Sequence, residues 1–320
     1  MISYEVIIVG GGPAGSTCAW RLKQSGVQCA ILEKSVFPRA KLCAGWITPQ
    51  VLSALNLDLN NYPHSLTSFE KLHFHFYGKA ITIKTQQYAI RRYEFDDWLL
   101  SRSGVLVHNH EVRKIIKDGE HYIIDDKFRC KYLVGAGGTY CPVYRTFFQE
   151  KNPRIKDKQI TTLEEEFVYD YHDANCYLWF FENRLPGYSW YVPKKNGYVN
   201  IGIGGVLSKL RQRGDTIKSQ WNSFVQKLRD LSLIDDRSFD PKGYNYFLRQ
   251  NRVVGQINRC YIVGDSAGLA TKDMGEGIGR AIESGILAAY SIVNRTQYSL
   301  RSISKYSMPK MLLKFLMRLS

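Results

Sequence analysis

The glycine-rich stretch GGGPAG at residues 10–15 constrains the fold of this chain more than any other feature. It follows the apolar run YEVIIV at residues 4–9, which is typical of a parallel strand buried on both faces. The residues after it, STCAWRLKQSG, predict a helix, and VQCAILEK predicts a second strand that ends at Glu33. Strand, glycines, helix and strand in this order predict a dinucleotide-binding βαβ unit.

The residue types in this unit suit a phosphate-bearing cofactor. Gly10, Gly12 and Gly15 fit G-x-G-x-x-G, so the backbone can turn tightly and approach a pyrophosphate at the helix N-terminus. Glu33, 18 residues after Gly15, falls where a carboxylate can accept both ribose hydroxyls. NAD and FAD share the adenosine diphosphate half, so these residues alone do not distinguish the two cofactors.

A second motif, at residues 259–293, favours FAD. It predicts a buried strand, then Gly264-Asp265, a loop, and a long helix that begins near residues 275–277. Asp265 at the strand end can accept hydrogen bonds from a ribityl chain. The glycine-rich helix N-terminus can stabilise the negative charge that a reduced isoalloxazine gains. A nicotinamide dehydrogenase has no need of this second element, so the sequence predicts FAD as the cofactor.

With these motifs the chain resembles the geranylgeranyl reductase family of flavoproteins, within the p-hydroxybenzoate hydroxylase-like class. The likeness runs from residue 4 to about residue 293, and it includes the stretches KLCAGWITP (41–49), RRYEFDDWL (91–99) and PGYSWYVP (186–193). The last stretch is close to the family pattern Y-x-W-x-F-P, with Val192 in place of the phenylalanine.

The resemblance implies an α/β fold, with a Rossmann-type FAD-binding domain interleaved with an antiparallel β-sheet substrate domain. The expected FAD-binding segments are 1–60, 91–150 and 250–295, and the expected substrate-domain segments are 61–90 and 151–249. The FAD contacts that the resemblance implies come from Ala14, Glu33, Cys43, Ala44, Arg92, Val112, Asp265, Gly277 and Ile278.

Physical reasoning supports Arg92, because a guanidinium before an amphipathic helix suits a pyrophosphate. A solvated cation at a helix start is the alternative, and the neighbouring Arg91 competes for the role. Gly137 stands where the class usually carries the aspartate of an Asp-Gly pair associated with the nicotinamide. The electron donor therefore stays open among NAD(P)H, ferredoxin and a quinol.

The stretch PGYSWYVPKKNGYVNIGIGG at residues 186–205 predicts a hairpin of strands 188–193 and 198–204. We expect its aromatic face to line a cavity for a long apolar substrate. We also expect its glycines to let the backbone approach the flavin or a ligand. An aromatic core without substrate contact is the alternative. The candidate catalytic residues are Tyr188, Trp190 and Cys43, with Tyr188 or Cys43 as a proton relay.

A net charge of +15 favours anionic partners, but no nucleic-acid-binding signature is present. Residues 294–320 hold six Lys/Arg and no acid. There, Lys310, Lys314 and Arg318 predict a basic amphipathic helix at a membrane interface, with an ordinary core helix as the alternative. The N-terminus predicts a strand and not a signal peptide, and seven dispersed cysteines predict reduced thiols. We expect a cytoplasmic protein, soluble or peripheral to a membrane.

Two further groups of polar residues are expected to be structural. His73 and His75, like His108 and His110, form H-x-H pairs on predicted strands, but no third ligand has matching spacing, so no metal site is expected. The acids at residues 164–166 could serve general acid–base chemistry, but they are expected to be exposed on a strand.

Three classes of function follow. The first is an FAD-dependent oxidoreductase that reduces C=C bonds of an isoprenoid or prenyl-lipid substrate. The second is a flavin-dependent monooxygenase or halogenase, because the hairpin also resembles the halogenase element W-x-W-x-I-P; the separate halogenase lysine motif is not found. The third is a flavin-holding maturation or assembly factor.

Overall fold

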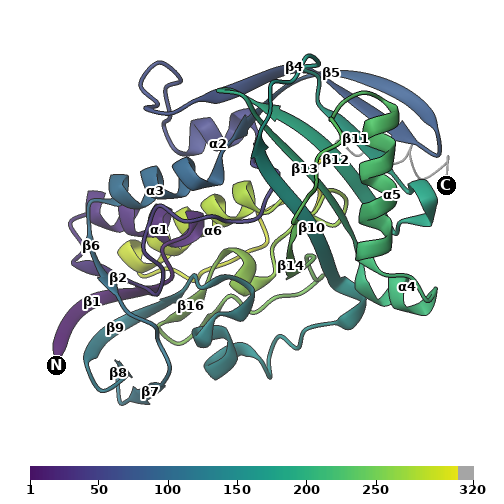
Figure 1. The fold of residues 1–320 in the computed structure, drawn as a ribbon. Helices are drawn as coiled ribbons and strands as arrows, with labels where there is room; N and C mark the ends of the chain where they lie inside the picture. The colour runs from purple at the N-terminus through teal and green to yellow at the C-terminus, as the bar shows by residue number, and fades with distance from the viewer. Residues whose placement is uncertain (309–320) are drawn as a thin grey trace. The chain divides into compact units, whose positions relative to one another are not determined.

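The computed structural model describes residues 1–308, in which the chain forms two interleaved units (Figure 1). Unit 1 comprises Met1–Arg39, Asp96–Arg154 and the chain from Phe247 onward, and unit 2 comprises Ala40–Phe95 and Ile155–Tyr246. Each unit is built on one eight-stranded sheet. The expected α/β class, with a Rossmann-type sheet and a second, mostly antiparallel sheet, is confirmed.

The sheet of unit 1 has the order β15-β16-β9-β1-β2-β6, with β8 added to β9 and β7 to β8. Its central pairs, β1 with β2 and with β9, are parallel, as the buried apolar run predicts. The strands are β1 (Ile2–Val9), β2 (Cys29–Glu33), β6 (Leu106–Asn109), β7 (Ile115–Asp118), β8 (His121–Ile124), β9 (Phe128–Gly135), β15 (Gln256–Ile257) and β16 (Cys260–Ile262).

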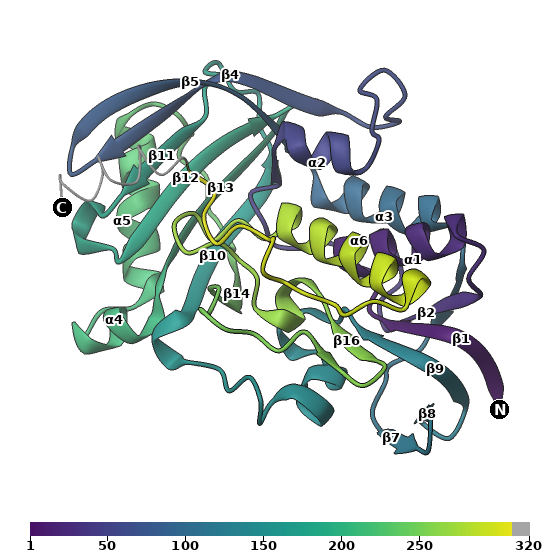
Figure 2. The same cartoon turned by 180° about the vertical axis from the view of Figure 1, so that it is seen from behind.

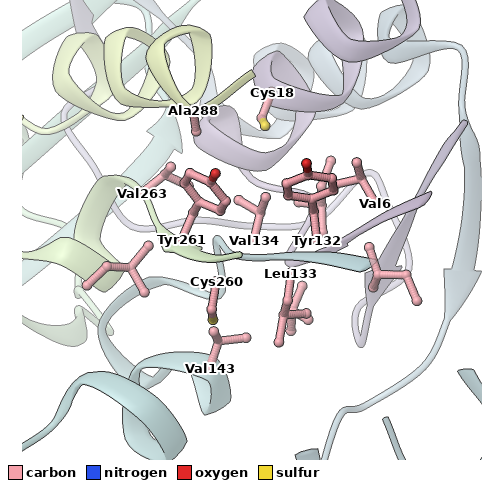
Figure 3. Close-up of a cluster of buried hydrophobic side chains, with 14 of the residues drawn as sticks. Val6, Cys18, Tyr132, Leu133, Val134, Val143, Cys260, Tyr261, Val263 and Ala288 are labelled. Atoms are coloured by element: carbon pink, nitrogen blue, oxygen red, sulfur yellow. The ribbon is translucent and has the colours of Figure 1, made fainter. Parts of the chain in front are cut away.

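Helices α1 (Pro13–Gln24) and α6 (Ile278–Asn294) lie side by side on one face of this sheet (Figures 1 and 2). Figure 3 shows how alternation along the strands builds the core on both faces. The rings of Tyr132 and Tyr261 point toward the helices, and Leu133 and Cys260 point the other way. The short helices of this unit are η1 (Gly138–Tyr140), η2 (Tyr144–Phe148) and η5 (Gly264–Ala267).

The sheet of unit 2 has the order β14-β10-β13-β12-β11-β4-β5-β3. The predicted hairpin is confirmed as β12 and β13 in antiparallel register, whereas β11 and β4 pair in parallel. The strands are β3 (Trp46–Ile47), β4 (Leu66–Phe76), β5 (Lys79–Ile90), β10 (Gln159–Val168), β11 (Tyr177–Phe180), β12 (Gly187–Lys194), β13 (Tyr198–Val206) and β14 (Lys242–Phe247).

The first crossing between units comes after Arg39, earlier than the boundary near residue 60 that the sequence suggests. The reason is local, since β3 pairs with β5 and so joins the sheet of unit 2. Helix α3 (Arg92–Ser103) begins in unit 2 and continues in unit 1. The remaining helices are α2 (Pro49–Ala54), α4 (Leu207–Gln212), α5 (Ile217–Asp230), η3 (Lys156–Lys158) and η4 (Glu182–Arg184).

The two faces of the unit 2 sheet have different roles. On the helix face, Tyr191, Ile201 and Phe167 form a core with the apolar side of α5. Thr216 caps α5 by accepting a hydrogen bond from the Ser219 amide, 3.1 Å away. Since side chains alternate along each strand, the even-numbered residues of β10, β12 and β13 point away from α5. We call that second side the aromatic face.

No helix among residues 1–308 is long and apolar enough to cross a bilayer. The expected basic amphipathic segment, with Lys310, Lys314 and Arg318, falls outside the described residues except for its first part.

Candidate functional site

The glycine turn between β1 and α1 requires glycine at two positions. Gly10 has φ +111°, and a Cβ there would come within 2.5 Å of the Ala136 carbonyl oxygen. A Cβ on Gly15 would come within 1.9 Å of the Gly10 carbonyl oxygen. Side chains at these positions would therefore break the turn itself.

Gly12 differs, because its missing side chain leaves open space. Only Arg39 Nη2, 3.7 Å away, lies within 4 Å of the position of a Cβ on Gly12. Gly12 is the N-cap of α1, no side chain caps the helix, and its first turn contains no acid. The N–H groups at the start of α1, with Ala14 among them, are thus suited to an anion.

Arg39 is a residue that the sequence reasoning missed. Its guanidinium lies beside the glycine turn, packs over the Phe37 ring at 4.6 Å and is 3.5 Å from the buried carboxylate of Asp96. A cation held against Gly12 in this way complements a pyrophosphate at the helix N-terminus. The only sequence signal was a single arginine six residues after Glu33.

Glu33 lies at the end of β2 and is buried. Its Oε2 accepts a hydrogen bond from the Gly11 amide at 2.6 Å, and its Oε1 accepts one from the Ser35 amide at 2.8 Å. These bonds fix the carboxylate beside the glycine turn. A pocket of about 350 Å³ in unit 1 opens next to it, lined by Glu33, Val36, Phe37, Leu100, Val107 and Asn109 among others.

Val112 lies near the same end of β2. The His110 amide donates a hydrogen bond to the Glu33 carbonyl at 2.8 Å, so the chain after β6 passes beside Glu33. The Val112 side chain itself is buried in the hydrophobic core of unit 1.

The second motif meets the first, although about 250 residues separate them. A Cβ on Gly264 would lie 3.1 Å from the Ala14 Cβ, so the turn after β16 touches the start of α1. A Cβ on Gly277 would lie 3.5 Å from Asp265 Oδ1, which puts that carboxylate beside the N-cap of α6, just before Ile278. Two helix N-termini and one carboxylate thus converge in unit 1.

Arg154 is a second residue that the sequence reasoning missed. Its Nη2 donates hydrogen bonds to the carbonyl oxygens of Asp265, at 3.1 Å, and Ser266, at 2.8 Å. Burial lowers the pKa of this guanidinium. The contact holds the short helix η5 that carries Asp265.

In unit 2, Cys43 and Ala44 lie half-buried in the loop before β3. The Gly45 amide lies 3.4 Å from Cys43 Sγ. Gly45 has φ +74°, and a Cβ there would come within 2.0 Å of the Ile90 carbonyl oxygen and 2.9 Å of Lys194 Nζ. The loop therefore packs tightly against the end of β5 and the end of β12.

Arg91 and Arg92 have distinct environments. Arg91 makes ion pairs with Glu166 at 2.8 Å and Glu94 at 3.0 Å, and its guanidinium lies 3.5 Å from the Tyr198 ring centroid. Arg92 is buried, so it is not a solvated cation at a helix start. Of the two arginines, Arg92 keeps its candidacy for a cofactor phosphate.

A continuous row of rings crosses the aromatic face. Successive centroids are 6.0 Å apart from Phe74 to Phe76, 4.7 Å to Phe180, 4.9 Å to Tyr188 and 5.7 Å to Trp190. Trp190 Nε1 donates a hydrogen bond to Asn200 Oδ1 at 2.7 Å, which ends the row at a polar group.

The hairpin glycines make room for other side chains of unit 2, and not for the flavin or a ligand as expected. A Cβ on Gly202 would come within 2.1 Å of Trp190 Cζ2, so the indole ring itself occupies that space. Gly205 faces the opposite side, toward Leu185 and Leu210. Gly202 and Gly205 therefore do not leave space for a ligand to approach the backbone.

The expectation that the acids of β10 are exposed is wrong for two of them. Glu164 is 4% exposed, and Glu166 forms ion pairs with Arg91 and, at 2.5 Å, with the buried ammonium of Lys194. Both acids point to the aromatic face, whereas Glu165 points the other way. Three consecutive acids on a strand are typical of a solvated segment, which explains the error.

The four histidines of the two H-x-H pairs have individual structural contacts, three of them on strands and His110 just after β6. His73 bonds to Asn175 and Thr82, and His75 stacks on Trp179 at 5.7 Å between centroids. His108 bonds to the Tyr4 hydroxyl at 2.8 Å, and His110 pairs with Asp125 at 2.7 Å. Within the described part of the chain, no group of three ligands could hold a metal ion.

Comparisons with known proteins agree with the fold. Residues 8–77 match the family model described as "NAD(P)-binding Rossmann-like domain". A menaquinone reductase of Mycobacterium tuberculosis is 26% identical over 338 residues, which cover 92% of this chain and 77% of that protein. Digeranylgeranylglycerophospholipid reductase 2 of Methanopyrus kandleri is 25% identical over 315 residues, which cover 90% of this chain and 76% of that protein.

Solved structures resemble the chain along almost all of its length. A geranylgeranyl bacteriochlorophyll reductase-like protein of Thermoplasma acidophilum has a TM-score of 0.79 at 19% identity, covering 100% of this chain and 83% of that chain. The flavin-dependent halogenase CmlS has a TM-score of 0.75 at 21% identity, covering 92% of this chain and 59% of that chain. The shared fold is that of flavin-dependent oxidoreductases.

Proposed function

We propose a function from one premise: the chain is a relative of the geranylgeranyl reductase family of flavin-dependent oxidoreductases, as its motifs predict. The proposal is that it binds FAD and reduces C=C bonds of an isoprenoid chain in a prenyl lipid. The relatives whose names specify prenyl lipids support this substrate class.

The residues of unit 1 fit an FAD molecule. Gly12, Arg39 and the α1 N-terminus suit the pyrophosphate, and Asp265 with the N-cap of α6 suits the ribityl chain and the flavin ring. The pocket beside Glu33 supports FAD over FMN, because only FAD has an adenosine half to occupy it. Cys43, Ala44 and Arg92 are proposed contacts from unit 2, by resemblance.

The row of rings from Phe74 to Trp190 is the observation that carries the substrate class. A long hydrocarbon chain offers no polar group along most of its length, so it must be recognised by apolar and aromatic surface. Phe74, Phe76, Phe180 and Trp190 are shielded from bulk water, and Tyr188, the ring next to Trp190, is only partly buried. Tyr188 and Trp190 therefore remain proposed substrate contacts.

When bound, the reduced flavin would supply a hydride to one alkene carbon. An isolated alkene has no carbonyl to polarise, so the protein contributes position and exclusion of water. The second carbon needs a proton from the protein, for which Tyr188 and Cys43 are the candidates from the sequence. The electron donor stays open among NAD(P)H, ferredoxin and a quinol.

An oxygen-using function is the second candidate, because the fold is also that of a halogenase. The two differ in their need for oxygen. A reductase converts its substrate under strict anaerobiosis once the flavin is reduced, whereas a monooxygenase or halogenase does not. Photoreduced flavin that is reoxidised by no substrate, together with tight binding of a protein partner, would favour an assembly factor instead.

Replacing Trp190 by phenylalanine tests the aromatic row. We expect normal flavin content and a roughly tenfold fall in kcat/KM, since loss of one aromatic contact is worth about 0.5–1.5 kcal/mol. Trp221→Phe is the matched control, because Trp221 is equally buried but lies on α5, against the helix face. Steady-state kinetics on a prenyl lipid give the comparison. Equal losses in both variants would assign Trp190 to the core alone.

The basic C-terminal segment is proposed to contact anionic membranes, through which a prenyl lipid would be reached. We expect the full chain to co-sediment with anionic liposomes at low salt, and a version ending at Ser307 to bind less, because each cation contributes about 1 kcal/mol near anionic lipid. Equal binding by the two versions, or binding that is indifferent to salt, would discard the proposal.

The proposed function can be tested in the cell by comparing lipid extracts with and without the protein by mass spectrometry. Loss of the protein should produce a prenyl lipid lighter by two hydrogens for each bond left unreduced. Identical prenyl-lipid profiles would count against the proposal.

A further inference from the structure

The pairing of three strands places Glu164 beside the last ring of the aromatic row. In the register of β10, β13 and β12, Glu164 is opposite Gly202, and Gly202 is opposite Trp190. A Cβ on Gly202 would come within 2.8 Å of the Glu164 Cβ and 2.1 Å of the Trp190 ring. The acid and the end of the ring row therefore flank the same glycine.

The Glu164 carboxyl also meets the loop that carries Cys43. It accepts a hydrogen bond from the Cys43 backbone N–H. By the family resemblance, Cys43 is a proposed flavin contact, and it lies in unit 2 with Glu164. One carboxyl thus lies between the proposed flavin-contacting loop and the proposed substrate wall.

Charged groups from two other elements and from its own strand surround this carboxyl. Lys194 at the end of β12 and Arg92 at the start of α3 are cations, and Glu166 on β10 is an acid. Lys194 is paired with Glu166, which Arg91 also binds. Lys194 thus has Glu166 as a partner already, and Glu164 lies beside that ion pair as a second acid.

The pKa values of Glu164 and Glu166 are shifted in opposite directions. Burial raises the pKa of Glu164 to about 7, against the lowering effects of Lys194, the Cys43 amide and Arg92. Burial also disfavours ionisation of Glu166, but the charge and hydrogen bonds of Lys194 and Arg91 lower its pKa below the usual value. Two acids on one face whose pKa values are shifted apart are suited to acid–base chemistry.

We propose that Glu164 is the proton donor to the alkene in the reduction. This inference rests on the proposed function. The bound reduced flavin would supply a hydride to one alkene carbon, and Glu164 would give its O–H proton to the other, so that the double bond becomes a single bond. The flavin would be left oxidised, and Glu164 would be left as a carboxylate that Lys194 and Arg92 stabilise. A proton from solvent then restores the acid.

Glu164 suits this role better than the two candidates from the sequence. The Tyr188 ring is stacked in the aromatic row, where it serves as apolar surface. Cys43 supports the Glu164 carboxyl through its backbone N–H. A carboxylic acid that is protonated near neutrality can release its proton without an additional base.

The test compares Glu164→Gln with Glu165→Gln in the flavin-loaded protein. Glu165 is the matched control, because it is the next residue on β10, faces away, and accepts a hydrogen bond from the Asp240 amide. With photoreduced protein and a prenyl lipid, E164Q should slow product formation by about 10²-fold or more, and E165Q should leave it unchanged. The wild-type rate should fall above about pH 7, whereas the residual rate of E164Q should not follow that pH profile.

A second readout does not depend on activity. Infrared difference spectra between about pH 5 and pH 9 should contain a protonated-carboxyl band that E164Q lacks and E165Q retains. The protonated Glu164 carboxyl should also contribute to the free energy of unfolding of the wild type. This contribution is complete below the unfolded pKa near 4.5, and it is lost as the pH rises through about 7. E164Q should lack this dependence.

The outcomes separate the two proposals. If wild type reduces the lipid and E164Q does so at an equal rate, the proton donor is another group while the proposed function stands. An E164Q spectrum that retains the carboxyl band would overturn the assignment of the acid in the same way. If wild type reduces no prenyl lipid, the proposed function fails, and the role of Glu164 fails with it.

Discussion

Gly12→Val is expected to yield folded protein that purifies without flavin. Gly12 has an extended backbone that valine can adopt, and a Cβ there meets only Arg39 at 3.7 Å. The new methyl groups would occupy the open space at the α1 N-terminus where a pyrophosphate must approach the backbone. The absorbance spectrum of the purified protein measures flavin content, and thermal unfolding of the flavin-free protein measures the fold.

Gly12→Ala is the graded control, because it adds one methyl group at the same position and should weaken flavin binding less. Gly15→Val should instead prevent folding, since its Cβ would lie 1.9 Å from a backbone oxygen. A Gly12→Val protein that retains full flavin occupancy would contradict the phosphate site.

Asp265→Ala is expected to lower flavin affinity by roughly 10- to 150-fold. The carboxylate lies beside the Gly277 N-cap of α6, where the ribityl hydroxyls and flavin ring are proposed to bind. A hydrogen bond to a charged group is worth about 1.5–3 kcal/mol, which corresponds to that range. Fluorescence titration of flavin-free protein with FAD gives the dissociation constant.

Asp265→Asn keeps an oxygen acceptor and should recover part of the lost affinity. HPLC of the flavin released from wild-type protein identifies it as FAD or FMN. Unchanged affinity in both Asp265 variants would show that the second motif only stabilises the start of α6, and the assignment of the ribityl site would be wrong.

The sequence predicted the structure correctly where neighbouring residues determine the local backbone conformation. Gly10 and Gly15 are required by the turn between β1 and α1, and the hairpin of β12 and β13 follows from aromatic residues around a Lys-Asn-Gly turn. The contact of Asp265 with the α6 N-cap was also foreseeable, since strand, acid and helix follow each other closely in the chain.

The sequence was a poor guide where a residue depends on partners far along the chain. Glu164 and Glu166 belong to a run of three acids, which is typical of an exposed segment. Their surroundings become apparent only when the sheet brings Lys194 and Trp190 of β12 to the same face. The position of Arg39 beside the glycine turn was equally unpredictable, because a single arginine in a loop belongs to no periodic pattern. Its contact with Gly12 depends on the fold of the intervening chain.

The most direct test of the account is the reaction itself. Flavin-loaded protein is photoreduced under anaerobic conditions and incubated with geranylgeranyl diphosphate, a digeranylgeranylglyceryl phospholipid or a menaquinone, and the lipids are analysed by mass spectrometry. The account predicts that at least one lipid gains two hydrogens per reduced bond, with stoichiometric reoxidation of the flavin and without oxygen. Reduced protein that leaves every one of these lipids unchanged, but modifies a substrate only when oxygen is admitted, would contradict it.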